Sequence, residues 1–555
     1  MATMNKKRSG VVEDKRKTVN HERKVVHDLT SLETLFSKVL GSFFGESTYY
    51  EKRSAENDFK EVQKLIADIP EEDIEYALKI ARIGREYNMI QFPLAVLTAC
   101  FNDERFKGDN FEDECTGRNK LQTYSDYIVR RGRDITDVLA MQMNVFGFDV
   151  TTKGRGKNKT NHRNRPLPSQ MRKALKFKLE TFSEYQLSKA LGERREVSMA
   201  DAVKLLHPNP VNSKVSKDFF TRIIEGKVVF GGDEENKQVQ SELSKLNNKT
   251  SKTTKADVRK SIDTSTVMAI VKNLVALYNA GMFNDIATVE KVCAKLTNRK
   301  EVQKSRLLPF RFYSAYQQVK DLSCGSRGKR MILDALVEAM DYSIDNLPNI
   351  EGYSAVLIDR SGSMRYPVSG ASDVSADVVA CILGAICFKK GIADLYVFGS
   401  HCKRVDDVSS KSTLMDITEK LLRTFVGGGT YIDEALNTIY KSGAKYQNLI
   451  ILTDNDCYYS GDNTFRFTTY SSINRNHADD ILNRLISEGV IKKVFLDNLL
   501  GNSFTIMNTD DFRKNLITGF SERIVDMINV YSSLGRGASD VRNLIDSIVE
   551  TLPTR

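Results

Sequence analysis

The hydrophobic pattern of this 555-residue chain changes character near residue 350. Before that point apolar residues recur at helical spacing, as in 73–101, where Ile74, Ala77 and Leu78 share one face. After it, short strand-like runs alternate with helical segments. A chain with these two periods must build two kinds of core, one between helices and one against a sheet.

The first part, 30–350, is predicted to be an α-helical repeat. A helix, a tight break and a second helix form the unit of an α-solenoid, and the pattern continues through 264–281 and 287–298. No strict sequence repeat is visible, so this prediction depends on helix density. We interpret the polar stretch near 231–262 as an inserted mobile segment or a solvated helix, and residues 1–29 as a basic, disordered tail.

The second part, 351–535, is predicted to be an α/β domain, followed by a C-terminal helix within 536–555. The strand-like runs are 353–359, 393–400, 448–454 and 492–499. Helical segments lie between them, which indicates a parallel, Rossmann-like sheet covered on both faces. Ligands of such sheets collect at the carboxyl ends of the strands.

Five oxygen-bearing side chains fall at these predicted strand ends or at the helix start between them. They are Asp359, Ser361, Ser363, Thr430 and Asp454. Two carboxylates, hydroxyls and room for water suit a hard, octahedral cation such as Mg²⁺, and the lack of His and Cys in the set argues against zinc or copper. The alternative is that the two serines cap a helix and the first aspartate closes a turn.

Charge is divided unevenly along the chain. The first 350 residues carry 60 basic and 47 acidic residues, whereas the last 205 carry 22 and 25, so the net charges are +13 and −3. Residues 153–178 hold ten basic residues and no acidic one. Such a run attracts polyanions through phosphate neutralisation; the alternative is a solvated loop that keeps the protein soluble.

The spacing DxSxS, then Thr, then Asp resembles the metal-ion-dependent adhesion site of von Willebrand factor A domains. In that family an acidic group of a partner protein fills the open coordination position, and the resemblance implies no hydrolysis. The segments 77–99, 167–190, 197–210 and 302–319 resemble the TROVE module of the Ro autoantigen family. That second resemblance covers roughly residues 30–535.

The resemblance implies a HEAT-like ring of helical repeats that is closed by a von Willebrand factor A-like domain. It further implies that Y-like RNA binds the outer surface and that single-stranded 3′ ends of misfolded RNA enter the hole of the ring. His207, Arg194 and Lys189 are the RNA-binding residues that carry over. Charge and spacing alone add Arg172, Lys173 and Lys176, which lie within one helical turn of each other.

We therefore expect a noncoding-RNA-binding scaffold for RNA quality control or ribonucleoprotein assembly that has no catalytic residues. The alternative is a metal-dependent protein adhesion scaffold without specific RNA binding. Expected partners are small noncoding RNA and an acidic protein or an exoribonuclease at the metal site, with the ring monomeric and not membrane-bound. Eight scattered cysteines and the lack of a signal peptide favour the cytoplasm.

Overall fold

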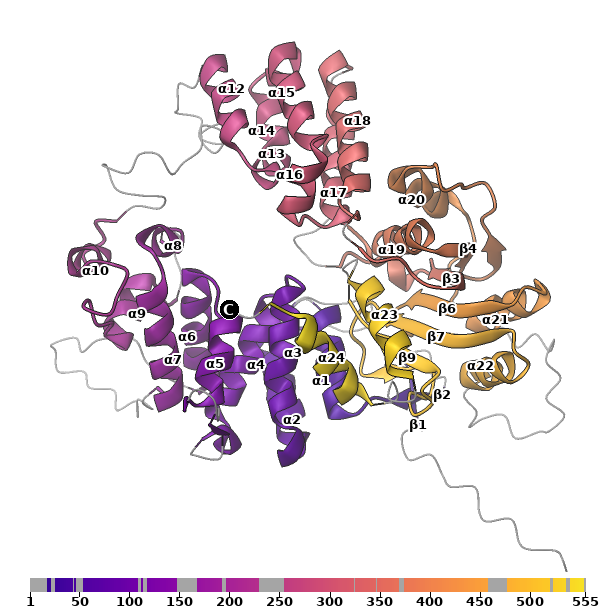
Figure 1. The fold of residues 1–555 in the computed structure, drawn as a ribbon, viewed down its shortest axis with the longest axis horizontal. Coiled ribbons are helices and arrows are strands. Elements are labelled where there is room, and N and C mark those ends of the chain that lie inside the picture. Colours follow the sequence, from indigo (N-terminus) through magenta and orange to yellow (C-terminus); the bar gives the residue numbers. More distant parts are fainter. Residues whose placement is uncertain are drawn as a thin grey trace, which may run out of the picture.

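Helices build the first part of the chain and a sheet lies at the heart of the second part in the computed structural model (Figure 1). The structure describes residues 17–20, 25–42, 44–45, 53–107, 111–112, 117–146, 167–191, 196–228, 254–323, 325–345, 347–368, 374–457, 477–519, 523–535 and 540–553. Arg194 and most of the basic run 153–178 lie outside these residues.

The first helical arm consists of α1–α10 and two 3₁₀ turns. These are α1 (Ser31–Gly41), α2 (Ala55–Asp68), η1 (Glu71–Asp73), α3 (Glu75–Glu86), α4 (Gln91–Asn102), η2 (Glu104–Phe106), α5 (Lys120–Ile128), α6 (Gly132–Phe146), α7 (Ser169–Thr181), α8 (Glu184–Ser188), α9 (Met199–Leu206) and α10 (Lys217–Ile224). The helices pack side by side along the arm, with α3 on α4, α4 on α6 and α6 on α9. The stripe predicted on 73–101 is buried, since Ala77 and Leu78 are both fully inaccessible.

The second helical arm consists of α12–α18. These are α12 (Lys255–Thr264), α13 (Val267–Lys272), α14 (Leu274–Asn279), η5 (Met282–Asn284), α15 (Ile286–Leu296), α16 (Arg299–Ser305), α17 (Pro309–Lys320) and α18 (Arg327–Tyr342). Part of the range expected as a polar insertion is thus the helix α12, whereas residues 229–253 lie outside the described residues. Helix α18 packs on both α15 and α17.

The α/β part holds a six-stranded sheet. Its strands are β3 (Tyr353–Asp359), β4 (Ile392–Phe398), β5 (Cys402–Arg404), β6 (Tyr446–Thr453), β7 (Ile491–Asn498) and β9 (Lys514–Ile517), in the order β5-β4-β3-β6-β7-β9. All neighbours are parallel except β4 and β5. The order therefore reverses between β3 and β6, as in doubly wound sheets.

Helices cover both faces of this sheet. The helices of the α/β part are η6 (Ser363–Arg365), α19 (Ala376–Lys390), α20 (Leu414–Arg423), α21 (Ile432–Lys441), α22 (His477–Ser487), α23 (Ile524–Leu534) and α24 (Val541–Thr551). Alternate residues of β3 enter different cores: Val356 and Ile358 pack in the core that includes α19, and Leu357 packs in the core with α21 and α22. Both faces of β3 are buried, which explains why most of its residues are hydrophobic.

The N-terminal region differs from the disordered tail that the sequence led us to expect. Strands β1 (Lys17–Val19) and β2 (Val25–Asp28) form an antiparallel sheet with β8 (Phe504–Thr505). Val26 of β2 is fully buried in the same core as Phe504. The correction has a physical reason: strands this short are stabilised by a partner almost 480 residues away, which local sequence cannot reveal.

Both helical arms are attached to the α/β part. In the first arm, the Ser42 hydroxyl donates to the carbonyl of Leu500 at 3.0 Å, and α24 packs on α3. In the second arm, Oδ1 of Asp341 accepts from the backbone N–H of Leu414 at 2.7 Å. Figure 1 shows α12–α18 standing apart from α1–α10, with the α/β part beside both.

Within the described part of the chain no helix is both long enough and apolar enough to span a membrane.

Candidate cation site and candidate nucleic-acid interface

Two adjacent strands of the sheet end side by side where the strand order reverses. Strand β3 ends at Asp359, and its neighbour β6 ends at Thr453, directly before Asp454. In the sheet, β4 lies next to β3 on one side of this point, and β7 lies next to β6 on the other side. Crevices of open α/β sheets form at such a position because the two connecting loops diverge. The strand ends predicted to bind a cation therefore lie at the natural ligand-binding edge of the fold.

The five predicted cation ligands are buried here, each with 7% or less of its surface exposed. The backbone N–H of Ser361 donates to Oδ1 of Asp359 at 2.8 Å, and the hydroxyls of Ser361 and Ser363 lie 3.2 Å apart. The loop that carries these serines is joined to the glycine turn before Thr430, since the N–H of Gly362 donates to the carbonyl of Gly428 at 2.9 Å.

The helix-capping alternative for the serines does not describe this loop. The 3₁₀ turn η6 has Gly362 at its N-cap, and no side chain caps it. The hydroxyl of Ser361 instead faces that of Ser363. Arg360, between the aspartate and the first serine, caps the end of α20: Nη1 donates to the carbonyls of Leu421 and Thr424 at 3.3 and 3.2 Å.

Electrostatics at this edge favour a cation. Burial raises the pKa of Asp359 to about 7, and the negative charge of Asp454 adds to the rise. Two carboxylates buried close together raise each other's cost of ionisation, and a bound cation would lower that cost. Among the described residues no group of three or more His, Cys, Asp and Glu side chains is placed to hold a metal. The donor set of two carboxylates and three hydroxyls fits a hard cation that keeps some of its water.

Sequence reasoning missed the residues that support this loop. The Thr453 hydroxyl donates to Oδ2 of Asp359 at 2.6 Å, and Nδ2 of Asn502 donates to the carbonyl of Asp454 at 2.5 Å. Nδ2 of Asn20, from the N-terminal hairpin, donates to the carbonyl of Cys457 at 3.0 Å. Of these only Thr453 had a local indication, because it directly precedes a predicted ligand.

The predicted RNA-binding residues of α7 form an exposed basic face. Arg172 and Lys173 are exposed and Lys176 is partly exposed, whereas Met171 and Leu175 are buried on the opposite side of the helix. The first turn of α7 contains no acidic residue. Only Lys176 has an acidic neighbour on its own helix, Glu180, at 4.0 Å.

His207 lies in a loop that docks beside the end of α7. Its backbone adopts a left-handed conformation, with φ 47°, at the C-terminal end of α9, and its side chain is exposed. Two residues later the N–H of Asn209 donates to Oε1 of Glu180 at 2.6 Å. Because the same oxygen faces Lys176, Glu180 joins the His207 loop to the basic face of α7. Lys189, at the C-cap of α8, is also exposed.

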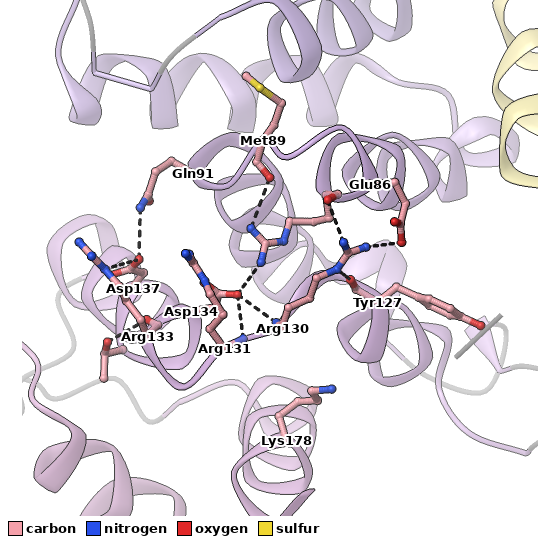
Figure 2. A network of polar contacts seen from close by, with 12 residues as sticks. Glu86, Met89, Gln91, Tyr127, Arg130, Arg131, Arg133, Asp134, Asp137 and Lys178 are labelled. Carbon is pink, nitrogen blue, oxygen red and sulfur yellow. Dashed lines mark hydrogen bonds and ion pairs between the residues drawn. The ribbon is translucent and has the colours of Figure 1, made fainter. Parts of the chain in front are cut away.

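A network of arginines fixes the helices beneath this surface (Figure 2). The buried carboxylate of Asp134 accepts from Arg85 and Arg131, with N–O distances of 2.6 Å to each. Arg130 reaches the carbonyl of Arg85 at 2.8 Å and the carboxylate of Glu86 at 2.5 Å. Figure 2 shows Arg130 and Arg131 beside Asp134, with Lys178 on a neighbouring helix. The arginines of this network are therefore committed to structure.

Two exposed aromatic residues of this region were also missed by sequence reasoning. Phe177 on α7 is 41% exposed and Tyr185 on α8 is 48% exposed. A cation lies over each ring: the guanidinium carbon of Arg118 is 4.8 Å from the centroid of Phe177, and Nζ of Lys189 is 4.0 Å from that of Tyr185. The position of Phe177 four residues after Lys173 was the available indication.

This architecture is similar to that of known proteins. Residues 250–346, which include α12–α18, match the family model of the TROVE domain. Among solved structures, the chain is similar to the Ro protein (RSR) of Deinococcus radiodurans, with a TM-score of 0.58 and 16% identity over 92% of this chain and 99% of that chain. The PilB minor pilin from Streptococcus sanguinis matches over 38% of this chain and 64% of that chain at 14% identity, but its TM-score of 0.22 carries no argument. Residues 250–346 are therefore similar to the TROVE domain, and the chain as a whole shares the fold of this Ro protein.

Proposed function

We propose that this protein is Ro-like, binds noncoding RNA and acts as a scaffold in RNA quality control or ribonucleoprotein assembly. The observation that carries the proposal is the basic face of α7, where Arg172 and Lys173 are exposed and Lys176 is partly exposed beside the docked His207 loop. Clustered cations on one helix face neutralise phosphates and position a nucleic acid without reading its sequence. The net charge of +13 on residues 1–350 supports the same assignment.

Two classes of RNA are proposed. A structured, Y-like RNA would bind the outer surface made by α7, α8 and the His207 loop, together with Arg194. Single-stranded 3′ ends of misfolded RNA would enter the hole of a HEAT-like helical ring. The attachment of both helical arms to the α/β part supports a ring, and structured RNA is typically bound through shape and backbone contacts.

We also propose that the α/β part is a von Willebrand factor A-like domain with a metal-ion-dependent adhesion site. Asp359, Ser361, Ser363, Thr430 and Asp454 would hold Mg²⁺ directly or through water. A bound Mg²⁺ would supply a positive charge and an open coordination position for an acidic group of a protein partner. An exoribonuclease is one such partner.

The second candidate function is a metal-dependent protein adhesion scaffold without specific RNA binding. The buried carboxylates of Asp359 and Asp454 favour it, because they predict cation binding whether or not RNA is bound. Under either function the protein acts by binding and not by catalysis, as a monomer in the cytoplasm. The two functions differ in whether they predict that a specific set of RNAs binds the protein.

The experiment is sequencing of the RNA that copurifies with the protein. The test variant is Arg172→Gln/Lys173→Gln/Lys176→Gln/His207→Gln, and the control variant is Lys411→Gln/Lys441→Gln/Lys445→Gln, which removes as many lysine and arginine charges from the exposed surface of the α/β part. A small set of structured RNAs that is enriched on the wild type and the control, and lost from the test variant, would support the proposal. Heterogeneous RNA retained equally by all three would contradict it and favour the adhesion scaffold.

A further inference from the structure

Exposed apolar side chains are concentrated in the segment of the chain that begins with α7. Among the described residues, seven large hydrophobic side chains are exposed, and four of them lie between residues 177 and 224. These four are Phe177, Tyr185, Val211 and Ile224. Single exposed apolar residues are ordinary on protein surfaces, but the concentration of four of them in one segment of the chain needs a reason.

Phe177 belongs to the cationic face of α7. It follows Lys173 by four residues and Lys176 by one, so its ring emerges among the exposed basic side chains. Asp126 holds Arg118 over the ring, because its Oδ2 lies 3.3 Å from Nη1 of Arg118. The ring is thus backed by a planar cation on one side and remains 41% exposed.

Tyr185 repeats this arrangement on α8. The start of α8 is fixed by a capping box, in which Ser183 accepts from the N–H of Gln186 and the Gln186 side chain accepts from the N–H of Ser183. Tyr185 lies inside this capped turn, and Lys189, one turn later, places Nζ 4.0 Å from its ring centroid. A short helix that is capped in this way holds an exposed ring at a defined position.

We propose that Phe177 and Tyr185 are stacking sites for unpaired bases of the RNA bound at the α7–α8 surface. This inference rests on the proposed RNA-binding function and adds the class of RNA: one that presents single-stranded nucleotides next to a paired region. Every base has a flat face that stacks on an aromatic ring, whereas bases inside a duplex do not expose that face. Cations over the rings strengthen the contact and neutralise nearby phosphates.

The charge of the surface selects RNA over a protein partner. Lys189 lies over the ring of Tyr185, Arg172, Lys173 and Lys176 share α7 with Phe177, and the first turn of α7 has no acidic residue. An apolar protein surface would have to bury these cations, which costs free energy unless acidic groups pair with them. A nucleic acid supplies both the flat apolar surface and the negative charge.

The test compares two RNAs of matched sequence in a binding titration: a fully paired duplex, and the same duplex interrupted by a short unpaired tract. The protein variants are Phe177→Leu and Tyr185→Leu, which keep apolar bulk but remove the ring, with Phe177→Tyr and Tyr185→Phe as conservative rescues. Phe425→Leu is the matched control, since Phe425 is an aromatic residue of the α/β part that is 72% exposed.

The expected result is that wild-type protein prefers the interrupted duplex by roughly 5- to 150-fold for each base stacked. Each leucine variant should reduce this preference while leaving affinity for the paired duplex unchanged, and the rescues should restore it. A fluorescent purine analogue in the unpaired tract should be quenched by the wild type and less by the leucine variants. If the wild type and the leucine variants preferred the interrupted duplex equally, the proposal that Phe177 and Tyr185 stack on bases would be overturned. If the wild-type protein bound neither RNA, the proposed RNA-binding function itself would be overturned. Binding of an acidic protein at this surface would instead assign it to a protein partner.

Discussion

Arg85 and Asp134 form an ion pair in the interior of the first helical arm. Nη2 of Arg85 lies 2.6 Å from Oδ2 of Asp134, and the two side chains are 4% and 0% exposed. The pair joins α3 to the start of α6, and the N–H groups of Arg130 and Arg131 also donate to the same carboxylate at 2.9 and 3.1 Å (Figure 2). The turn between α5 and α6 therefore depends on one buried negative charge.

Asp134→Ala is expected to lower the free energy of unfolding by about 3–5 kcal/mol, because it leaves the Arg85 guanidinium buried without its partner. Chemical denaturation followed by circular dichroism measures the change. Glu488→Ala, which breaks the exposed Arg484–Glu488 pair, is the control and should cost less than about 0.5 kcal/mol. Equal effects of the two substitutions would show that the buried pair does not stabilise the arm.

Gly328→Ala is expected to destabilise the TROVE-matched arm, although alanine is ordinarily the better helix former by about 0.5–1 kcal/mol. A Cβ at this position would lie 2.1 Å from the carbonyl oxygen of Phe283, which is backbone and cannot move aside freely. Overpacking of this kind typically costs about 1–3 kcal/mol, so the clash outweighs the gain. Thermal unfolding should show a lower Tm, whereas Gly325→Ala, which meets only open space, should leave it nearly unchanged.

Without divalent cations, stability is expected to fall as the pH rises from about 4 to about 7. Burial, with the Asp454 charge, raises the pKa of Asp359 from 3.8 to about 7. The folded protein therefore keeps a proton that the unfolded chain has released, and this protonation difference destabilises the fold progressively over that range. Calorimetry in a chelator should show a smaller fall for Asp359→Asn than for the wild type.

Addition of excess Mg²⁺ should remove most of that fall in the wild type, because the cation balances both carboxylates and binds only the folded state. Asp359→Asn should respond weakly, since it lacks one of the two charges. If Mg²⁺ shifted the Tm of the wild type and of Asp359→Asn equally at pH 8, the stabilisation would come from general ionic effects. The prediction of a cation site would then be wrong.

RNA binding is expected to weaken steeply with salt, in proportion to the number of phosphates that the α7 surface neutralises. Lys173→Gln should reduce the slope of log affinity against log salt by about 1, with a similar affinity loss for different RNA sequences. Titrations across a range of salt concentrations measure this slope. The control is Lys445→Gln on the α/β part, and an identical slope for the two variants would place the phosphates elsewhere.

Local pattern was sufficient to predict much of the architecture. The period of the apolar residues separated a helical part from an α/β part, and the strand runs beginning at 353 and 448 correspond to β3 and β6. The oxygen ligands could be grouped because parallel strands end at one edge. Phe177 and Asn502 were not found, because their roles depend on Arg118 and Asp454, which are distant in the chain. The cation over Tyr185 is local, but whether that ring is exposed depends on the fold.

The sequence by itself determined the elements, their order and the chemistry available at each strand end, because hydrophobic period and residue type act over a few residues. Only the tertiary structure decided that β2 pairs with β8, that Glu180 brings the His207 loop to Lys176, and that Asp134 joins Arg85 of α3 to the turn before α6. These contacts join residues whose separation in the chain has no local signature. They form because buried polar groups and short strands require partners, and the fold determines which partners are within reach.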